Sequence, residues 1–148
     1  MTYKELLEFN SLIQDSPALT LLQVGEGIEK ITQSLEFIAK RNNGTLKIKD
    51  SSEIQCDKFR LTPRNYEYAV LLNSLNICQD KEKFLNVIYH SLENSAQIIL
   101  IEKKEDSNLT ELLELLDVAN FRAINDIDII DGYYLVTAKK LHMWGAGL

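Results

Sequence analysis

The chain has 148 residues, of which 45% are apolar and 26% are charged, and its formal net charge is −6 at pH 7. This balance is typical of one globular domain, expected to span residues 1–148, and it excludes disordered, collagenous and coiled-coil chains. The net negative charge argues against binding to nucleic acids or anionic membranes, and the scattered acidic residues favour a solvated surface.

The few cysteines and histidines limit the chemistry that the chain can carry. Cys56 and Cys78 form no CxxC pair, which argues against zinc or thioredoxin-like redox sites and fits thiols in a reducing compartment. His90 and His142 lack partners at a diagnostic spacing, so we expect no metal site and assign no catalytic dyad. The start of the chain lacks the features of a signal peptide, and no apolar run is long enough to span a membrane, so we expect a cytoplasmic protein.

The first third of the chain predicts helices and strands in alternation. Apolar residues recur at helical spacing over residues 3–13, and a short apolar run at residues 19–24 is typical of a buried strand. Residues 28–38 carry apolar side chains at three- and four-residue steps, as in an amphipathic helix, and residues 42–44 (Asn-Asn-Gly) are typical of its left-handed cap. Residues 45–49 alternate apolar and charged side chains, which predicts a half-exposed strand.

The rest of the chain continues this alternation. Strand patterns occupy residues 54–61, 66–72, 97–102, 121–124 and 133–138. Asp80 and Asn108 are typical N-caps and precede predicted helices over residues 84–92 and 109–118. We therefore expect a largely parallel sheet with helices on both faces. The last two strands have no helix between them, which predicts an antiparallel hairpin at one edge of the sheet.

The join between the first predicted strand and its helix contains the first functional candidate, Gly25-Glu26-Gly27. Glycines let the backbone approach a ligand closely, and the start of a helix offers unpaired N–H groups and a positive dipole end. An ordinary tight turn explains two glycines at this spacing equally well. The Walker pattern and the third glycine of a dinucleotide fingerprint are absent.

Taken in order, these segments resemble class I S-adenosylmethionine-dependent methyltransferases. Residues 21–27 resemble that family's first motif, and residues 56–63 resemble the segment that follows its third strand. Residues 66–70, 92–99 and 133–140 resemble its fourth strand, its fifth strand with the preceding turn, and its terminal hairpin. The resemblance implies a three-layer α/β fold with a Rossmann-like methyltransferase sheet, mostly parallel with a terminal antiparallel hairpin.

The resemblance also implies a binding site for S-adenosylmethionine. It assigns the amino-acid part of the cofactor to Gly25, Glu26 and Gly27, the ribose to Asp50 and the adenine to Asp57. It places Asn73 and Asn76 at the mouth of the site, Asn73 on the side of the cofactor and Asn76 on the side of the substrate. It names no catalytic residue, because methyl transfer from an activated sulfonium can proceed by positioning alone.

Several residues depart from the family pattern. Gln23 replaces the acidic residue of the first motif, Glu29 stands where a third glycine is usual, and Asn120 replaces a glycine before the terminal hairpin. Asp50 and Asp57 are so close in the sequence that the region of the family's helix B must be shortened, which removes one wall of the adenosine pocket. We therefore expect weak cofactor binding, with a Kd on the order of 100 µM or higher.

Two functions remain open at this point. One is a small methyltransferase of unknown substrate. The other is a catalytically inactive interaction or scaffold module, which resembles in architecture the amino-terminal domain of the anamorsin family. Residues 141–148 form an apolar tail that carries Trp144, and we expect it to dock on its own domain, on a second copy in a homo-oligomer or on another protein. We expect the preceding Lys139 and Lys140 to be solvated.

Overall fold

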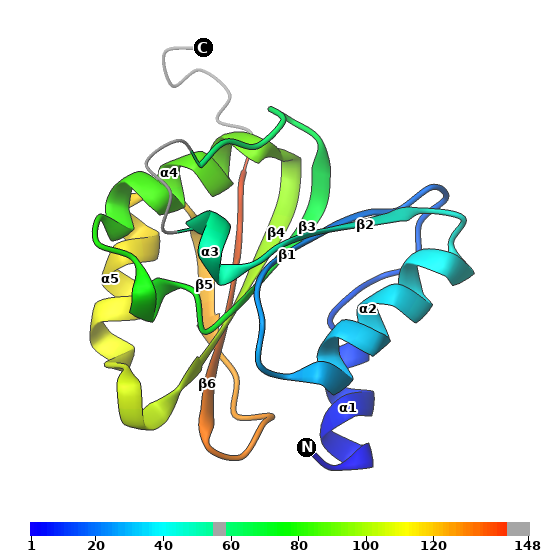
Figure 1. The fold of residues 1–148 in the computed structure, drawn as a ribbon, viewed down its shortest axis with the longest axis horizontal. Coiled ribbons are helices and arrows are strands. Elements are labelled where there is room, and N and C mark those ends of the chain that lie inside the picture. The colour runs from blue at the N-terminus through cyan, green and yellow to red at the C-terminus, as the bar shows by residue number, and fades with distance from the viewer. Residues whose placement is uncertain (55–58, 142–148) are drawn as a thin grey trace.

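The computed structural model describes residues 1–54 and 59–141, and over these ranges six strands form one sheet between two layers of helices (Figure 1). The strands are β1 (Thr20–Gly25), β2 (Thr45–Lys49), β3 (Tyr66–Leu72), β4 (Leu92–Lys103), β5 (Arg122–Asp126) and β6 (Tyr133–Lys139). The α-helices are α1 (Tyr3–Asn10), α2 (Glu29–Arg41), α3 (Ser51–Ile54), α4 (Lys81–Ser91) and α5 (Leu109–Val118). Two short 3-10 helices are η1 (Leu75–Ile77) and η2 (Lys104–Asp106). None of the helices in these ranges has the length and apolar character needed to cross a membrane.

The sheet has the strand order β2-β1-β3-β4-β6-β5. Strands β1 to β4 run parallel, whereas β6 lies between β4 and β5 and is antiparallel to both. The predicted parallel sheet and its terminal antiparallel hairpin are therefore confirmed. The strand order reverses between β1 and β3, and such a reversal opens a crevice outside the carboxyl ends of the strands.

The sheet has a hydrophobic core on each face, because successive side chains of a strand point to opposite sides. Leu22 of β1 packs in the core under α4 and α5, whereas its neighbour Leu21 packs in the core under α1 and α2. On β4, Ile98 and Leu100 belong to the α4–α5 core. Figure 1 shows these helix pairs on opposite sides of the sheet, which confirms the predicted three layers. By the same alternation, Glu102 points toward the α4–α5 side.

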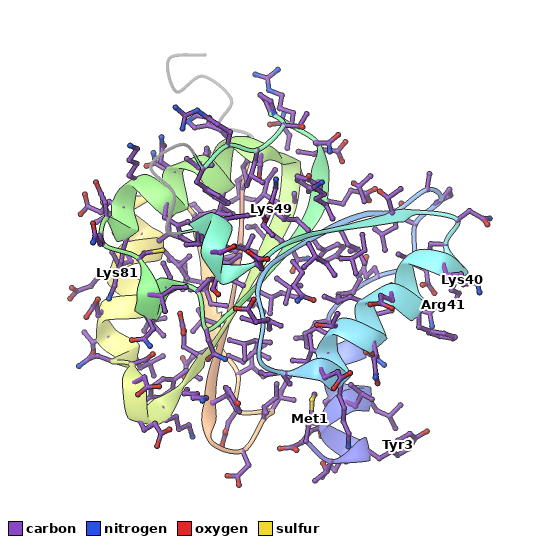
Figure 2. All side chains as sticks on the ribbon, in the orientation of Figure 1. Met1, Tyr3, Lys40, Arg41, Lys49 and Lys81 are labelled. Carbon is purple, nitrogen blue, oxygen red and sulfur yellow. The ribbon has the colours of Figure 1, made fainter. Side chains whose placement is uncertain are left out.

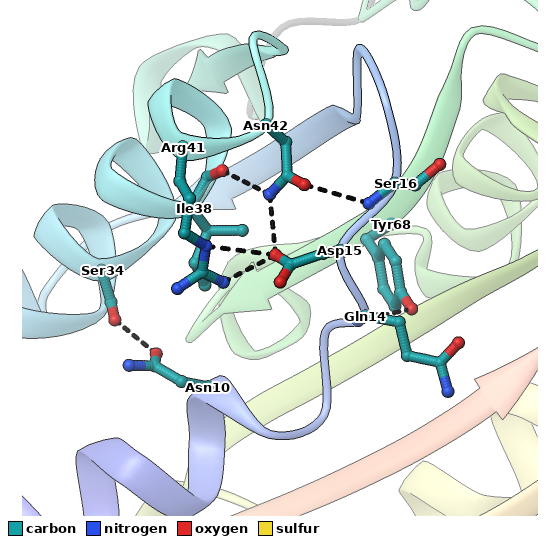
Figure 3. Close-up of polar contacts among 9 residues, drawn as sticks. All are labelled: Asn10, Gln14, Asp15, Ser16, Ser34, Ile38, Arg41, Asn42 and Tyr68. Carbon is teal, nitrogen blue, oxygen red and sulfur yellow. Dashed lines mark hydrogen bonds and ion pairs between the residues drawn. The ribbon is translucent and has the colours of Figure 1, made fainter.

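Polar contacts fasten the segment between α1 and β1 to the end of α2 (Figure 3). Asp15 Oδ1 accepts hydrogen bonds from Arg41 Nη2 at 2.7 Å and from Asn42 Nδ2 at 2.9 Å. Asn42 Oδ1 in turn accepts the backbone N–H of Ser16 at 3.0 Å. These hydrogen bonds lower the pKa of Asp15, the bond from Asn42 having the larger effect. The segment that follows α1 is thus held against the end of α2 by side-chain hydrogen bonds as well as by apolar packing.

The predicted left-handed cap of α2 is confirmed, and the residue that adopts it is Asn43, with φ of 53°. Gly44 is needed for a different reason. A Cβ on Gly44 would overlap the carbonyl oxygen of Leu19, so only glycine lets the chain pass this close to the start of β1.

The region after β2 differs from the sequence prediction. Ile54 ends helix α3, and none of residues 59–61 lies in a strand, so the strand expected over residues 54–61 is wrong for the residues described. The reason is local: the chain turns into α3 as soon as β2 ends, because the side chain of Asp50 accepts hydrogen bonds from its first turn. Helix α3 has only four residues, in line with the shortening expected in this region.

The end of β6 also differs from the prediction. Lys140 is 7% exposed, not solvated. Its Nζ donates a hydrogen bond to the carbonyl oxygen of Leu92 at 2.8 Å and lies 4.7 Å from the centre of the Tyr89 ring. Burial lowers the pKa of Lys140, and the charge of Arg64 lowers it further. The ammonium group therefore joins the end of β6 to the junction of α4 and β4.

Candidate functional site

The loop from Gly25 to Gly27 leaves the carboxyl end of β1, as predicted, but its two glycines have different roles. Gly25 is buried and has φ of +93°, and a Cβ there would overlap the carbonyl oxygen of Leu72 on β3. A glycine at position 25 is therefore required by the packing of β1 against β3, whether or not a ligand binds there. Gly27 is exposed and has φ of +113°, and a Cβ there would lie 3.3 Å from Asn73 Nδ2.

Gln23, which stands where the family has an acidic residue, forms hydrogen bonds from its buried side chain to this loop and to α2. It is 1% exposed, its Nε2 donates to the carbonyl oxygen of Gly25 at 3.0 Å, and its Oε1 accepts from Thr32 Oγ1 at 2.9 Å. A carboxylate could accept from Thr32 but could not donate to Gly25. The amide therefore fastens the glycine loop to α2 in a way that an acid could not.

Asp50 lies at the carboxyl end of β2, where the resemblance assigns it to the ribose, but its carboxylate caps α3. Asp50 Oδ1 accepts hydrogen bonds from Ser52 Oγ at 2.6 Å, Ser52 N at 3.1 Å and Glu53 N at 3.2 Å. The backbone N–H of Asp50 donates back to Glu53 Oε2 at 3.1 Å. The three bonds to Oδ1, that of the Ser52 hydroxyl first, lower the pKa of Asp50. Its Oδ2 has no hydrogen bond among the described residues.

The sequence contained the signal for this cap. Asp50 is followed three residues later by Glu53, which is the spacing of a capping box. Glu26 also turns to α3, since its Oε2 accepts the backbone N–H of Ser51 at 3.2 Å. Two of the three acids that the resemblance assigns to the cofactor, Glu26 and Asp50, are thus brought together, but around the first turn of α3.

Asn73 follows β3 and faces the glycine loop. Its φ is 52°, its backbone N–H donates to the carbonyl oxygen of Ile101 at 2.8 Å, and its Oδ1 accepts the N–H of Lys103 at 3.2 Å. These bonds to β4 leave Nδ2 directed at Gly27. The structure therefore brings Gly27 and Asn73 together across the β1–β3 boundary. Asp57, the residue assigned to the adenine, lies outside the described residues, as does the tail from residue 142 to residue 148 with Trp144.

Asn76 lies in η1, next to a buried carboxylate that sequence reasoning missed. Glu102 is 1% exposed, and its Oε1 accepts the backbone N–H groups of Leu75 at 2.8 Å and Asn76 at 3.3 Å. Burial raises the pKa of Glu102 to about 7, although these two hydrogen bonds act in the opposite direction. The available signal was the alternation along β4, because Glu102 continues the buried face of Ile98 and Leu100.

The described residues contain no strong nucleophile in this region. The Cys78 thiol lies 3.2 Å from the carbonyl oxygen of Ser74, and burial, followed by the charge of Glu102, raises its pKa to about 12. Such a thiol carries almost no thiolate at neutral pH. No group of three or more His, Cys, Asp or Glu side chains in residues 1–54 and 59–141 is placed to hold a metal ion.

Comparison with known proteins identifies the fold. No protein-family model and no curated protein matches the sequence. Among solved structures, a SAM-dependent methyltransferase from Aquifex aeolicus is 13% identical with a TM-score of 0.64, over 92% of this chain and 89% of that one. One from Mesorhizobium loti is 10% identical with a TM-score of 0.65, over 92% and 97%. Haemonchus contortus phosphoethanolamine N-methyltransferase 2, solved with S-adenosylhomocysteine, is 11% identical with a TM-score of 0.71, over 93% and 52%. The chain therefore has the Rossmann-like fold of class I methyltransferases.

Proposed function

We propose that the chain binds S-adenosylmethionine weakly, at the carboxyl ends of β1, β2 and β3, and that it is a small methyltransferase with an unidentified acceptor. The observation that carries this proposal is the meeting of Gly27 and Asn73 at the point where the strand order reverses. Ligands of open α/β sheets bind outside the carboxyl ends of the strands at such a point. The methyltransferases that share this fold support the same class of ligand.

The start of α2 supports binding of the amino-acid part of the cofactor. Ile28, the N-cap residue, forms no side-chain cap, so the first N–H groups of α2 are left to solvent or to a ligand. A carboxylate suits these N–H groups and the positive end of the helix dipole. Gly27 is exposed just before them and presents no side chain that would obstruct a ligand.

The proposed weakness follows from Asp50. A ribose diol is bound best when one carboxylate accepts a hydrogen bond from each hydroxyl. Asp50 Oδ1 already accepts three hydrogen bonds from α3, which leaves Oδ2 for the ribose. One missing charge-assisted hydrogen bond costs about 1.5–3 kcal/mol. We therefore expect a Kd of about 100 µM or higher, which corresponds to about −5.5 kcal/mol or a less favourable free energy.

Catalysis at this site would depend on positioning. S-adenosylmethionine, when bound, supplies a methyl group on an activated sulfonium, so the protein need not provide a nucleophile. Gly27 and Asn73 would hold the cofactor, and Asn76, which is exposed beyond β3, would lie on the side from which the acceptor enters. The raised pKa of Cys78 argues against a covalent intermediate on that thiol.

A second candidate function is a catalytically inactive interaction module on the same fold. The specific observation in its favour is that Asp50 and Glu26 are both engaged by the first turn of α3. In this chain, the polar groups that a methyltransferase would offer to a cofactor stabilise the protein's own structure instead. The two candidates differ in one measurable property, the binding of the cofactor.

Calorimetric titration with S-adenosylmethionine and S-adenosylhomocysteine tests the proposal. Gly27→Ala should weaken binding at least fivefold, because the methyl group would enter the space beside Asn73 Nδ2. Gly132→Ala is the matched control, since Gly132 also has a positive φ, of +83°, and no atom of the described residues lies within 4 Å of its added Cβ. Absence of binding at millimolar cofactor would refute the proposal and leave the interaction module. Equal binding by Gly27→Ala and the wild type would show that the ligand sits elsewhere.

A further inference from the structure

A pocket lies on the other side of β3 from the glycine loop, between the end of β4 and the starts of α4 and α5. Its volume is about 300 Å³, and its lining includes Asn76, Lys81, Glu102, Asp106, Glu111 and Leu112. This volume is at the lower end of the range found for small-molecule sites. The pocket shares no lining residue with the glycine loop, Asp50 or Asn73.

The pocket contains a buried oxygen atom without a partner. Glu102 Oε1 accepts two backbone N–H groups, whereas Glu102 Oε2 has no hydrogen bond among the described residues, although the side chain is 1% exposed. Burying a polar atom without a partner costs free energy, so a ligand that donates a hydrogen bond to Oε2 would recover it.

The charges around the pocket select the kind of ligand. Its lining holds four carboxylates, those of Glu102, Glu105, Asp106 and Glu111, against the single ammonium of Lys81. Lys81 lies on the α4–α5 side of the sheet (Figure 2), and its Nζ is 2.9 Å from Glu111 Oε1, so it is already paired. Such a surplus of negative charge attracts cations and repels anions.

Two alternatives to an organic cation fit the pocket less well. The start of α5 could attract an anion, but Asn108 Oδ1 already caps it by accepting the N–H of Glu111 at 3.0 Å. A metal ion would need several ligands in one place, and no group of three or more suitable side chains occurs among the described residues. An ammonium ion needs only one carboxylate, because its N–H groups donate directional hydrogen bonds.

We propose that this pocket binds a small alkylammonium ion, whose N–H donates to Glu102 Oε2 and whose alkyl chain lies along Leu75 and Leu112. Both leucines line the pocket. The inference goes beyond the proposed function, because it depends on Glu102, shares only Asn76 with the residues of that proposal, and needs no cofactor.

The binding should depend on pH in a characteristic way. Burial raises the pKa of Glu102 to about 7, and an ammonium ion binds only the ionised carboxylate. The other charged groups that face Glu102 are Lys81 from α4, Asp106 and Glu105 from η2, and Glu111 from α5. Affinity should therefore be about tenfold lower at about pH 6 than at about pH 8, and binding near neutral pH should release a proton.

Calorimetry on the whole chain without cofactor tests this proposal, with n-butylammonium as the probe. We expect a Kd on the order of 1 mM at about pH 8. Glu102→Gln should weaken binding at least tenfold, because the amide keeps the shape of the side chain but carries no charge. The matched control is Glu114→Gln on the exposed part of α5, which removes the same charge outside the pocket and should leave the Kd unchanged.

Three results would overturn the proposal. They are equal binding by Glu102→Gln and wild type, equal binding of uncharged 1-butanol, or preferential binding of butyrate. If circular dichroism shows that Glu102→Gln is unfolded, the wild-type protein alone still tests the proposal. Its two readouts are the pH dependence of the Kd and the proton release on binding, the latter measured by calorimetry in two buffers of different ionisation enthalpy. A flat profile between about pH 6 and pH 8 would contradict the role of Glu102.

Discussion

The polar groups on the two sides of β3 differ in whether they have hydrogen-bond partners within the protein. On the β1–β2 side, where a methyltransferase would hold its cofactor, Asp50, Glu26 and Gln23 are bound to the protein's own backbone and side chains. On the β4 side, Glu102 Oε2 is buried without a partner among the described residues. Polar groups of the expected cofactor site therefore stabilise the protein's own structure, whereas the neighbouring pocket is lined by a residue with an oxygen atom that has no partner in the part of the chain that the structure describes.

The shortened connection after β2 explains the first half of this comparison. Helix α3 has four residues and starts directly after Asp50, so its orphan N–H groups need acceptors close by. Asp50 and Glu26 supply those acceptors, so Asp50 has less to offer a ribose and Glu26 less to offer the amino-acid part of the cofactor. On the other side, the carboxylate of Glu102 already caps η1 with one oxygen, and the fold supplies no donor for the other within the described ranges.

The largest expected effect separates the two glycines of the β1 loop. Gly25→Ala should lower the free energy of unfolding by about 4 kcal/mol or more, because its Cβ would overlap the Leu72 carbonyl of a central strand. Gly27→Ala should cost about 1–3 kcal/mol, the range for backbone strain alone, and Gly132→Ala a similar amount. Urea unfolding measures all three. A Gly25→Ala protein as stable as the Gly27→Ala protein would contradict the assignment of Gly25 to packing.

The next effect concerns the dependence of stability on pH. Glu102 has a pKa of about 7 in the folded chain, above the ordinary 4.5, so its protonated form favours folding. Its contribution is complete below pH 4.5 and is lost as the pH rises through about 7, a loss of about 3 kcal/mol.

Glu102→Gln should remove this fall in the free energy of unfolding between about pH 5 and pH 7. The lowered pKa values of Asp15 and Asp50 act at lower pH and with the opposite sign, so they do not mask it. Urea unfolding at a series of pH values is the measurement. An unchanged slope in the Glu102→Gln protein would show that the carboxylate is solvated.

A smaller effect on the free energy of unfolding is expected from Gln23→Glu, which restores the acidic residue of the family's first motif. Gln23→Glu removes the N–H donor to the Gly25 carbonyl and places a carboxylate at a position that is 1% exposed. We expect a loss of about 1–3 kcal/mol in the free energy of unfolding. Gln33→Glu, on the exposed side of α2, is the matched control and should change it by less than about 0.5 kcal/mol. If Gln23→Glu stabilised the chain, our account of the glycine loop would be wrong.

The smallest effect on stability is expected at Asp50, where two substitutions separate capping from ligand binding. Asp50→Ala should cost about 1 kcal/mol through loss of the α3 cap and should weaken binding of S-adenosylhomocysteine about tenfold. Asp50→Asn keeps an oxygen for the cap but loses the charge, so it should weaken binding with little change in stability. Thermal unfolding and calorimetry on the same samples provide both readouts. Unchanged affinity in both variants would exclude Asp50 from the ligand site.

Much of the fold could be predicted because its signals are local. The alternation in β2, the apolar run of β3 and the capped helix α5 gave the observed bounds directly, since each depends on residues close in sequence. Helix α3 was missed because its four residues include a single apolar side chain, that of Ile54, and therefore show no periodicity, although the Asp50–Glu53 spacing was present.

The candidate site was less accessible to sequence reasoning, because its properties depend on contacts between distant segments. Gly25 and Gly27 look equivalent in the sequence, and only the pairing of β1 with β3 shows that one of them is held by Leu72. The burial of Glu102 and Lys140 likewise depends on the elements that cover them. A charged residue at a strand end is usually exposed, so the alternation along β4 was a weak signal for Glu102, and the tertiary structure was needed to establish the burial of both residues.

The most direct test of the account follows backbone amide signals by NMR during two separate titrations of the same protein. S-adenosylhomocysteine should shift the amides of Gly27, Ser52 and Asn73 and leave those of Leu75 and Asn76 unchanged. Butylammonium should do the reverse, because the N–H groups of Leu75 and Asn76 donate to Glu102. Failure of the first titration alone would refute the cofactor site, and failure of the second alone the ammonium pocket. If both ligands shifted the same amides, the division of the sheet edge into two sites would be contradicted.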